Sequence, residues 1–325
     1  MKTINQLNVL ITGAGGPAAV CTYKSLSEKI DSIHMADMDC LSAGLYLVTP
    51  DRRHIIPAAK HPDFVNQLLG ICIDQKIDVL IPTVDFELLQ LAKAKEEFLK
   101  YGIKILVTEA EVLANIMNKH ALLSLVDQTV DVGQHGMLAS EQLENWSGKK
   151  VVIKPISGSG SRGVEIYESV TDIPAYKLEN PTLMIQEYAE GPEYSVDVMV
   201  TEDGKVKAAV PRLRMRTDSG VSVTGKVELN QDVIEYVERV LSKVGLTYMA
   251  NVQVITTSAG PRLIEINPRC SGGLSLVIAS GADTPLMAVK ALIGEEVEVA
   301  QDIKEIAMVR MFTETFMPAQ DLAVA

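Results

Sequence analysis

Residues 8–115 alternate short apolar runs with amphipathic stretches, and this alternation limits the fold more than any other feature of the chain. The apolar runs NVLIT, SIHMAD, DVLIPT and KILVT are typical of strands, while helices are expected from Ala18, around 64–73 and from Phe86. Strands separated by helices form βαβ units, whose strands run parallel. We therefore predict an α/β protein with an N-terminal Rossmann-like domain built on a parallel sheet.

The first strand-to-helix turn carries a glycine pattern with two interpretations. Gly13, Gly15 and Ala18 fit the G-x-G-x-x-A pattern of dinucleotide-binding turns, and Asp37 ends the second strand, where such a fold holds a ribose. Taken alone, this pattern is typical of an NAD-binding site. Glycines also make tight turns in doubly wound domains that bind no dinucleotide. Asp85 ends another strand of this sheet, where it either lines a ligand cleft or caps the next helix.

The composition excludes several classes of function. The chain has 325 residues, is 47% hydrophobic and 22% charged, and carries a net charge of −12. These values are typical of a globular chain of two or three domains, and the negative charge argues against a nucleic-acid partner. Its four cysteines are far apart, so we expect a reducing, cytoplasmic location. No signal-like N-terminus and no uncharged apolar run of about 20 residues is present, which predicts neither export nor a membrane partner.

Residues 151–167, VVIKPISGSGSRGVEIY, predict two strands joined by a glycine-rich loop. Lys154 lies in the first strand, and Gly158, Gly160 and Gly163 lie in the loop. Glycines let a backbone approach a phosphate closely and a lysine supplies a compact charge, so this region suits a lid over a triphosphate. It is not a Walker loop, because no GKS or GKT sequence opens a helix after it. A flexible hairpin tip beside an unrelated lysine is the alternative.

Charged residues that suit a nucleotide also occur on both sides of this loop. A helix is expected over 117–126, with Lys119 on a different face from its buried stripe of Met117, Leu122, Leu125 and Val126. Glu187 lies in a later predicted strand, residues 184–188, and Glu193 follows the turn at 190–192. Carboxylates at such a bend can accept hydrogen bonds from an adenine amine and from ribose hydroxyls. Ordinary surface glutamates are the alternative.

Arg212, Arg214 and Arg216 alternate along one predicted strand and therefore share a face. Three like charges in a row repel one another unless an anion lies among them, and arginine matches carboxylates and phosphates bidentately. An exposed edge strand guarded by charges is the alternative.

Residues 250–269, ANVQVITTSAGPRLIEINPR, predict an antiparallel hairpin whose turn centres on Ala259. This register pairs Gln253 with Glu265, and Asn267 follows on the same face. A sparse set of oxygen ligands suits Mg²⁺, which takes its remaining ligands from water and nucleotide phosphates. An ordinary amphipathic hairpin with its polar side chains in water is the alternative.

The order of these segments resembles the ATP-grasp superfamily, and is most similar to the carbamoyl-phosphate-synthase-like carboxylate-amine ligases. The resemblance rests on KPxxGxGSxGV at 154–164, on QEYxxGxEYSVDV at 186–198, and on NVQ with EINPR in the hairpin. It implies a Rossmann-like pre-ATP-grasp domain over 1–115, followed by a two-subdomain ATP-grasp α+β fold. In that fold the lid subdomain would span 116–190, and the metal-binding subdomain would span 191–325.

The resemblance also implies a role for each candidate residue. The residues that would hold ATP are Lys119 and Lys154 at the phosphates, Gly158, Gly160 and Gly163 in the lid, Glu187 with the backbone of Tyr188 and Ala189 at adenine, and Glu193 at the ribose. The ligands of Mg²⁺, or of Mn²⁺ in its place, would be Gln253, Glu265 and Asn267. The catalytic cations facing the transferred phosphoryl group and the acyl phosphate would be Arg269 and Arg214. The N-terminal domain would then line a substrate cleft and would not bind NAD.

The reaction that the resemblance implies is phosphorylation of a small carboxylate by ATP, followed by attack of an amine or ammonia on the acyl phosphate. Positioned cations and a closing lid suit this chemistry. The chain shows no glutaminase region and no second half of a carbamoyl phosphate synthase, so we expect a small stand-alone ligase with small-molecule substrates. Homodimers are common among the proteins it resembles. The alternatives are a non-catalytic or partner-dependent ATP-binding subunit, such as a split synthase fragment, and an NAD-dependent oxidoreductase.

Overall fold

The computed structural model describes residues 2–158, 160 and 162–322. Its described strands form three sheets of five, six and four strands. The strands are β1 (Asn8–Thr12), β2 (Ser32–Asp37), β3 (Arg53–Ile55), β4 (Val79–Ile81), β5 (Lys104–Ile105), β6 (His135–Met137), β7 (Val151–Pro155), β8 (Glu165–Tyr167), β9 (Leu183–Glu187), β10 (Glu193–Val200), β11 (Val206–Asp218), β12 (Val221–Val227), β13 (Tyr248–Thr257), β14 (Gly260–Asn267) and β15 (Ala307–Val309).

Helices connect and cover these sheets. The α-helices are α1 (Pro17–Leu26), α2 (Phe64–Asp74), α3 (Asp85–Lys93), α4 (Lys95–Leu99), α5 (Ala110–Ile116), α6 (Lys119–Val126), α7 (Ala175–Leu178), α8 (Gln231–Val244), α9 (Leu274–Ser280) and α10 (Thr284–Ile293). The short 3₁₀ helices are η1 (Ile4–Gln6), η2 (Ala43–Leu47), η3 (Pro50–Arg52), η4 (Leu138–Ser140), η5 (Leu143–Trp146), η6 (Val170–Asp172) and η7 (Ala319–Asp321).

The N-terminal sheet has the strand order β3-β2-β1-β4-β5, and its described pairings are all parallel. Leu10 and Ile11 of β1 are fully buried and belong to two different core clusters, because helices cover both faces of the sheet. The strand order reverses at β1, between β2 and β4. In such sheets ligands bind beyond the carboxyl ends of the strands at that point.

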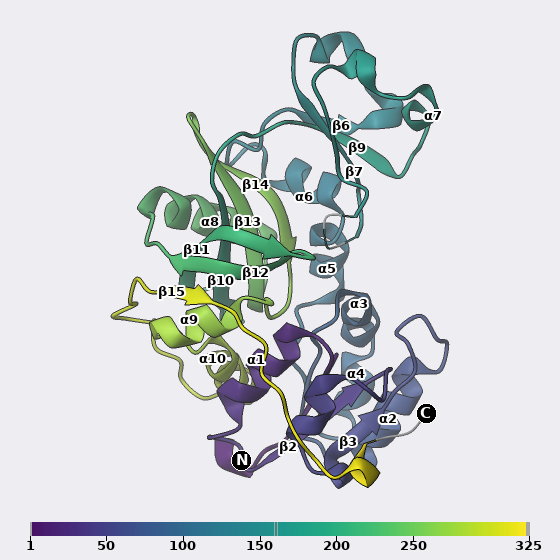
Figure 1. Ribbon diagram of the computed structural model, residues 1–325, viewed down its shortest axis with the longest axis vertical. Coiled ribbons are helices and arrows are strands. Elements are labelled where there is room, and N and C mark those ends of the chain that lie inside the picture. Colours follow the sequence, from purple (N-terminus) through teal and green to yellow (C-terminus); the bar gives the residue numbers. More distant parts are fainter. Residues whose placement is uncertain (1, 159, 161, 323–325) are drawn as a thin grey trace.

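The lid sheet has the antiparallel order β6-β9-β7-β8 and forms one end of the molecule in Figure 1. It has a small core of its own, in which the fully buried Trp146 packs with Ile153 and Ile185. The predicted glycine-rich loop joins β7 to β8, and Ser159 and Ser161 of this loop lie outside the described residues. A separate core lets this sheet keep its shape independently of the rest of the protein.

The central sheet has the antiparallel order β14-β13-β10-β11-β12-β15 and lies between the other two in Figure 1. Helix α8 packs its apolar stripe, which includes Val233, Val237 and Val240, into the same core cluster as β10 and β13. Helices α9 and α10 belong to the other cluster, together with Met199 and Val210 of this sheet. A parallel domain followed by antiparallel sheets confirms the predicted fold class. The boundaries placed after residues 115 and 190 stay predictions.

The prediction for helix α6 was wrong in one respect. Leu125 is 42% exposed, and the buried residues of the helix are Lys119, Leu122, Leu123 and Val126. These positions follow the i, i+3, i+4, i+7 spacing of a single helical face. Lys119 therefore starts the buried stripe and does not lie on a different face. The stripe packs against β14 and α8, which brings the Lys119 ammonium to the central sheet.

Within the described part of the chain, no single helix is long and apolar enough to cross a membrane. Helices α9 and α10 meet that criterion by length and composition only when taken together, and they are bent by 86° relative to one another.

Candidate active site

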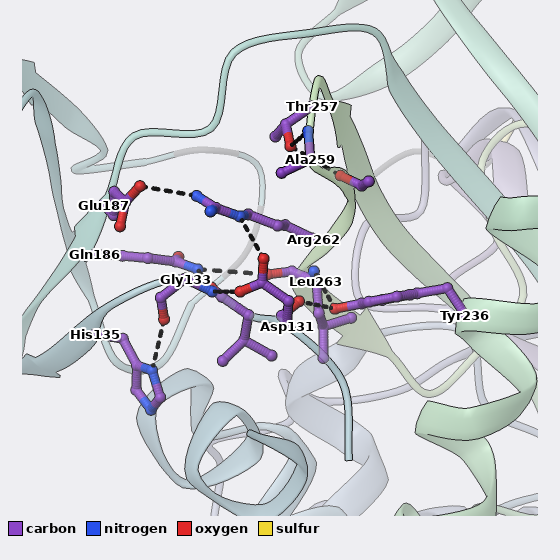
Figure 2. Close-up of polar contacts among 12 residues, drawn as sticks. Asp131, Gly133, His135, Gln186, Glu187, Tyr236, Thr257, Ala259, Arg262 and Leu263 are labelled. Atoms are coloured by element: carbon purple, nitrogen blue, oxygen red, sulfur yellow. Dashed lines mark hydrogen bonds and ion pairs between the residues drawn. The ribbon is translucent and has the colours of Figure 1, made fainter. Parts of the chain in front are cut away.

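Strands β13 and β14 form the predicted hairpin, in which Gln253 lies opposite Glu265. The turn is tighter than predicted, because Thr257 pairs with Gly260 across a two-residue turn. Figure 2 shows this tip, where the Ala259 amide donates to Thr257 Oγ1 at 3.1 Å. An irregularity in the ladder after Gln253 then restores the predicted register where the candidate metal ligands lie.

The three candidate metal ligands line a cavity of about 500 Å³, called the second cavity below. Glu265 Oε1 accepts a hydrogen bond from Asn267 Nδ2 at 3.0 Å, so these two side chains are in contact. Among the described residues, His, Cys, Asp and Glu form no group of three or more that could hold a metal. The candidate set instead combines one carboxylate, Glu265, with the amide oxygens of Gln253 and Asn267. This donor set fits Mg²⁺ that is completed by water and phosphate oxygens.

Lys119 and Lys154 approach this set from two different elements. Lys119 Nζ lies 3.2 Å from Glu265 Oε2 and donates to the Gly158 carbonyl at 2.7 Å. Lys154 Nζ donates to Gln186 Oε1 at 2.7 Å. Burial, together with the nearby charge of Lys119, lowers the pKa of Lys154 to about 8. An anion placed between the two ammonium groups would reverse this shift.

A first cavity of about 280 Å³ lies beside the second and brings most of the predicted nucleotide residues together. The predicted residues that line it are Lys119, Lys154, Gly158, Glu187, Tyr188, Ala189, Glu193, Gln253 and Glu265. Gly160 lines the second cavity and Gly163 lines neither. The sequence motifs therefore meet around one continuous space.

Glu187 has partners that the sequence did not reveal. Its carboxylate accepts from Arg262 Nη1 at 3.0 Å and lies 3.6 Å from Lys149 Nζ. Burial raises the pKa of Glu187, but Arg262 and Lys149 outweigh burial, so the pKa lies below its ordinary value. In Figure 2 the Arg262 side chain spans the space between Glu187 and Asp131. The carboxylate is therefore engaged by cations, and the backbone at Tyr188 and Ala189 is the better candidate for the adenine edge.

Two arginines of the predicted row pair with carboxylates of the protein. Arg212 is buried and donates to Asp197 Oδ2 at 2.6 Å, while Arg214 Nη1 lies 2.7 Å from Glu193 Oε1. Irregularities in the β11–β12 ladder flank Arg216, which is exposed. Protein carboxylates therefore neutralise two of the arginines, and solvent surrounds the third.

Burial raises the pKa of the Glu193 carboxyl, against the opposing charge of Arg214. Glu193 also lines the first cavity, at the edge that it shares with Ile255. Its position is compatible with a ribose contact.

Gly273 lies against Arg212. A Cβ at this position would come within 2.3 Å of Arg212 Nη1, so the close approach requires glycine.

Arg269 lies at the end of the hairpin and binds Asp85 through two hydrogen bonds of 2.8 and 2.9 Å. Asp85 is the first residue of α3, and no side-chain cap is formed there, so it lines the cleft and does not cap the helix. The pair joins the central sheet to the N-terminal domain. This contact between distant segments was not evident from the sequence.

A third cavity of about 620 Å³ lies at the carboxyl ends of β1, β2 and β4. Asp37 Oδ2 accepts from the Gly15 amide at 2.7 Å, and Pro17 begins α1 without an amide hydrogen. Buried Glu87 also lines this cavity and hydrogen-bonds Thr12. A pyrophosphate here would face carboxylates in place of free amides, which argues against the NAD interpretation.

The three cavities share lining residues. Arg162, Gln253 and Glu265 line both the first and the second cavity. Phe86, Arg269 and Gly272 are among those that line both the second and the third. The candidate site therefore runs from the bend after β9, past the candidate metal ligands, to the N-terminal domain.

Two protein-family models match the chain. Residues 9–106 match the model described as "PylC-like, N-terminal domain", and residues 179–315 match the model described as "ATP-grasp in the biosynthetic pathway with Ter operon". A D-alanine–D-alanine ligase of Corynebacterium urealyticum is 30% identical over 143 residues. That match covers 37% of this chain and 40% of the ligase, so the chain spans well under half of this curated relative's length.

Solved structures share the fold across nearly the whole chain. A biotin carboxylase from Campylobacter jejuni in complex with β-γ-ATP has a TM-score of 0.76 at 16% identity, covering 92% of this chain and 74% of its own. A carboxyaminoimidazole ribonucleotide synthase from Aspergillus clavatus complexed with ATP has a TM-score of 0.72 at 18% identity, covering 93% of this chain and 81% of its own. At these identities the likeness is one of fold.

Proposed function

The chain combines a PylC-like N-terminal domain with an ATP-grasp domain, and from this premise we propose that it is an ATP- and Mg²⁺-dependent ligase. It activates a small carboxylate as an acyl phosphate and joins it to an amine or ammonia. The observation that carries the proposal is that Lys119 and Lys154 lie beside the oxygen donors around Glu265, where the first two cavities meet. Cations beside a sparse oxygen set suit phosphoryl transfer.

The two lysines have specific tasks in this mechanism. Lys119 exchanges the Gly158 carbonyl and Glu265 for phosphate oxygens, and Lys154 keeps its proton once a phosphate lies beside it. Gln253, Glu265 and Asn267 would hold the metal, which would neutralise charge on the phosphates. The glycine-rich loop covers the reacting groups and excludes water.

Bond changes in the two steps balance without a side-chain nucleophile. A carboxylate oxygen of the substrate attacks the γ-phosphorus and ADP leaves. The amine nitrogen then attacks the acyl carbon, phosphate leaves, and the nitrogen gives up a proton. Arg269 is oriented by its pair with Asp85, where the second and third cavities meet. The relatives are described as a D-alanine–D-alanine ligase, a biotin carboxylase and a carboxyaminoimidazole ribonucleotide synthase, and they motivate this reaction class.

Four finer statements extend the proposal. We propose that Mn²⁺ replaces Mg²⁺ in part, because the oxygen donors suit both ions. We propose a cytoplasmic location, since all four cysteines are free thiols. We also propose that the protein belongs to the carbamoyl-phosphate-synthase-like class of ligases. We further propose that it is a homodimer, which light scattering of the purified protein would test.

A hydroxylamine trap tests the proposed function. Purified protein is mixed with ATP, Mg²⁺ and a panel of carboxylates, with hydroxylamine as the nucleophile that converts an acyl phosphate into a hydroxamate. We expect carboxylate-dependent release of ADP with one class of acid, and loss of this activity in Glu265→Gln. ATP binding without carboxylate-dependent ADP release would favour the non-catalytic subunit. Calorimetry showing binding of NAD and not of ATP would favour the oxidoreductase.

A further inference from the structure

Arg214 joins two parts of the candidate site. Its Nη1 lies 2.7 Å from Glu193 Oε1, and its Nη2 donates to the Gly220 carbonyl at 3.0 Å. The Arg214 side chain is 8% exposed, and its Nε is buried with no hydrogen-bond partner among the described residues. A buried donor without an acceptor destabilises the folded protein. The two remaining contacts therefore hold this side chain in place against an energetic cost.

The first of these contacts orients a carboxylate of the first cavity. Glu193 begins β10 and lines this cavity together with Tyr188 and Ala189, whose backbone is the candidate adenine edge. Burial raises the pKa of Glu193, and the charge of Arg214 opposes this by favouring the ionised form. Arg214 engages Oε1, which leaves Oε2 to accept a hydrogen bond from a ribose hydroxyl. Arg214 therefore influences both the charge and the orientation of this acceptor.

The second contact fixes the tip of the hairpin formed by β11 and β12. The tip is a two-residue turn, in which Ser219 and Gly220 have φ angles of 48° and 82°. Positive φ at both positions is typical of a type I′ turn, which continues the twist of the two strands. Irregularities on both sides of Arg216 disrupt the ladder below this tip. The hydrogen bond from Arg214 to the Gly220 carbonyl crosses this disrupted stretch and ties the tip to the regular part of β11.

The same tip lies against the glycine-rich loop that joins β7 to β8. A Cβ added to Gly220 would be 3.4 Å from the Cα of Gly160, so the two glycine backbones approach each other closely. Gly160 and Arg162 of the loop line the second cavity, as do Ser219 and Gly220 of the tip. The hairpin tip therefore forms a seat for the loop. A displaced seat would open the second cavity to water, which the proposed chemistry must exclude.

We propose that Arg214 is a positioning residue that links the ribose contact at Glu193 to the seat of the glycine-rich loop at Gly220. The inference rests on the part of the proposed function that places ATP in the first cavity. Arg214 then acts through these two neighbours and touches no reacting group, which replaces the catalytic role that the sequence motif indicated for it. Its loss should impair both ribose recognition and closure of the loop.

Nucleotide discrimination tests the contact with Glu193. Calorimetry measures the Kd of ADP and of 2′,3′-dideoxy-ADP, which lacks both ribose hydroxyls, for the full chain in the presence of Mg²⁺. We expect the wild type to bind ADP at least about fivefold more tightly, because an oriented carboxylate accepts hydrogen bonds from the hydroxyls. In Arg214→Met this ratio should fall below about twofold, since Glu193 loses the cation that orients it.

Limited proteolysis tests the seat of the loop. Arg162 is exposed, so trypsin can cleave after it, and mass spectrometry identifies the fragments. Saturating Mg²⁺ and AMP-PNP should slow this cleavage at least about tenfold in the wild type, because a seated loop rarely opens. In Arg214→Met, also saturated with the nucleotide, the cleavage should slow by less than about threefold.

Arg214→Lys separates the two contacts. A lysine ammonium can keep the ion pair with Glu193 but lacks the planar fork that also reaches the Gly220 carbonyl. This variant should keep the discrimination and lose the protection at Arg162, and it carries the test if Arg214→Met does not fold. Arg216→Met is the matched control, because Arg216 is an exposed arginine of the same strand. The control should match the wild type in both measurements.

The inference is overturned if Arg214→Met keeps either the discrimination or the protection of the wild type, or if Arg214→Lys loses the discrimination or keeps the protection. It is also overturned if the wild type shows no discrimination or no protection. Failure of the proposed function looks different, because neither measurement needs a carboxylate or turnover. In that case both measurements give the expected results, but the wild type shows no carboxylate-dependent release of ADP in the hydroxylamine assay.

Discussion

Arg269 binds Asp85 through two hydrogen bonds, one from Nε to Oδ1 at 2.8 Å and one from Nη2 to Oδ2 at 2.9 Å. The two side chains are 19% and 17% exposed, so water screens the pair only in part. The contact fixes the end of β14 against the start of α3. The proposed catalytic cation, Arg269, is thereby held in place by a residue of the N-terminal sheet's helix α3.

Asp85→Asn should therefore impair the reaction more than the fold. The amide keeps the size of the carboxylate but removes its charge, so Arg269 loses its orientation. We expect kcat for carboxylate-dependent ADP release to fall by about tenfold or more, with a loss of stability of about 1 kcal/mol in urea denaturation. Asp203→Asn, which breaks an exposed pair with Lys205, is the control and should change neither value. An unchanged kcat in Asp85→Asn would show that Arg269 needs no partner.

ATP affinity should weaken in alkaline solution because of Lys154. Its pKa in the free protein is lowered to about 8 by burial and by Lys119. Below this pH the Lys154 side chain is charged and can bind a phosphate directly. Above it, the neutral amine must first take up a proton. The Kd of ATP should therefore rise about tenfold between pH 7.5 and pH 9. Calorimetry checks this, and Lys154→Arg should flatten the profile, since arginine stays charged. A flat profile in the wild type would contradict the role of Lys154.

Stability should fall as the pH rises through the titration of Glu87. Burial raises the pKa of its carboxyl from 4.5 to about 7, against an opposing hydrogen bond from Thr12. The folded protein holds this proton more tightly than the unfolded chain, so the contribution is complete below pH 4.5 and is lost as the pH rises through 7.

Glu87→Gln should remove this dependence. The variant should match the wild type near pH 4.5 and be more stable at pH 8 by up to about 3 kcal/mol, as measured by urea denaturation. Glu238→Gln, at an exposed position of α8, should show no such difference. A Glu87→Gln variant that is less stable than the wild type at pH 8 would mean that the ionised carboxylate is needed in the fold.

The features that the sequence predicted correctly are local. Turn formers and alternating residues between 250 and 269 predicted the hairpin, and the pairing of Gln253 with Glu265 is observed. The βαβ alternation predicted the parallel sheet for the same reason, because strand and helix periods are visible within a few residues. The tight turn and the irregularity in the ladder were missed, since their effects on the register cancel before Glu265.

The features that the sequence did not predict depend on contacts between distant segments. Asp85 and Arg269 are 184 positions apart, and no local pattern links them. The arginines of β11 looked like an anion site because their carboxylate partners, Asp197 and Glu193, belong to another strand. Lys119 was assigned to the wrong face because a charged residue was not counted as part of a buried stripe. Its i, i+3, i+4, i+7 spacing with Leu122, Leu123 and Val126 was the available signal.

Arg262 should control the bend between the lid and the central sheet. It reaches from β14 to Glu187 at 3.0 Å and to Asp131 at 3.2 Å, as Figure 2 shows. Glu187 ends β9 of the lid sheet and Asp131 lies in the segment before β6, so one side chain holds both at a fixed distance from the hairpin. Arg262→Met keeps the length of the side chain and removes the charge. The Glu187 carboxylate would then lose its main cation, and its pKa should rise because burial is no longer offset.

We expect ATP to bind about three- to tenfold more weakly to Arg262→Met, because part of the binding energy must now order the lid. Asp131→Asn is the matched variant, since it weakens one contact of Arg262 and leaves the ion pair with Glu187 in place. Its ATP affinity should change by less than about twofold. Calorimetry with AMP-PNP measures both values. Tighter binding in Arg262→Met would mean that Glu187 contacts adenine once Arg262 no longer holds it, which is the role that the sequence motif first indicated for this carboxylate.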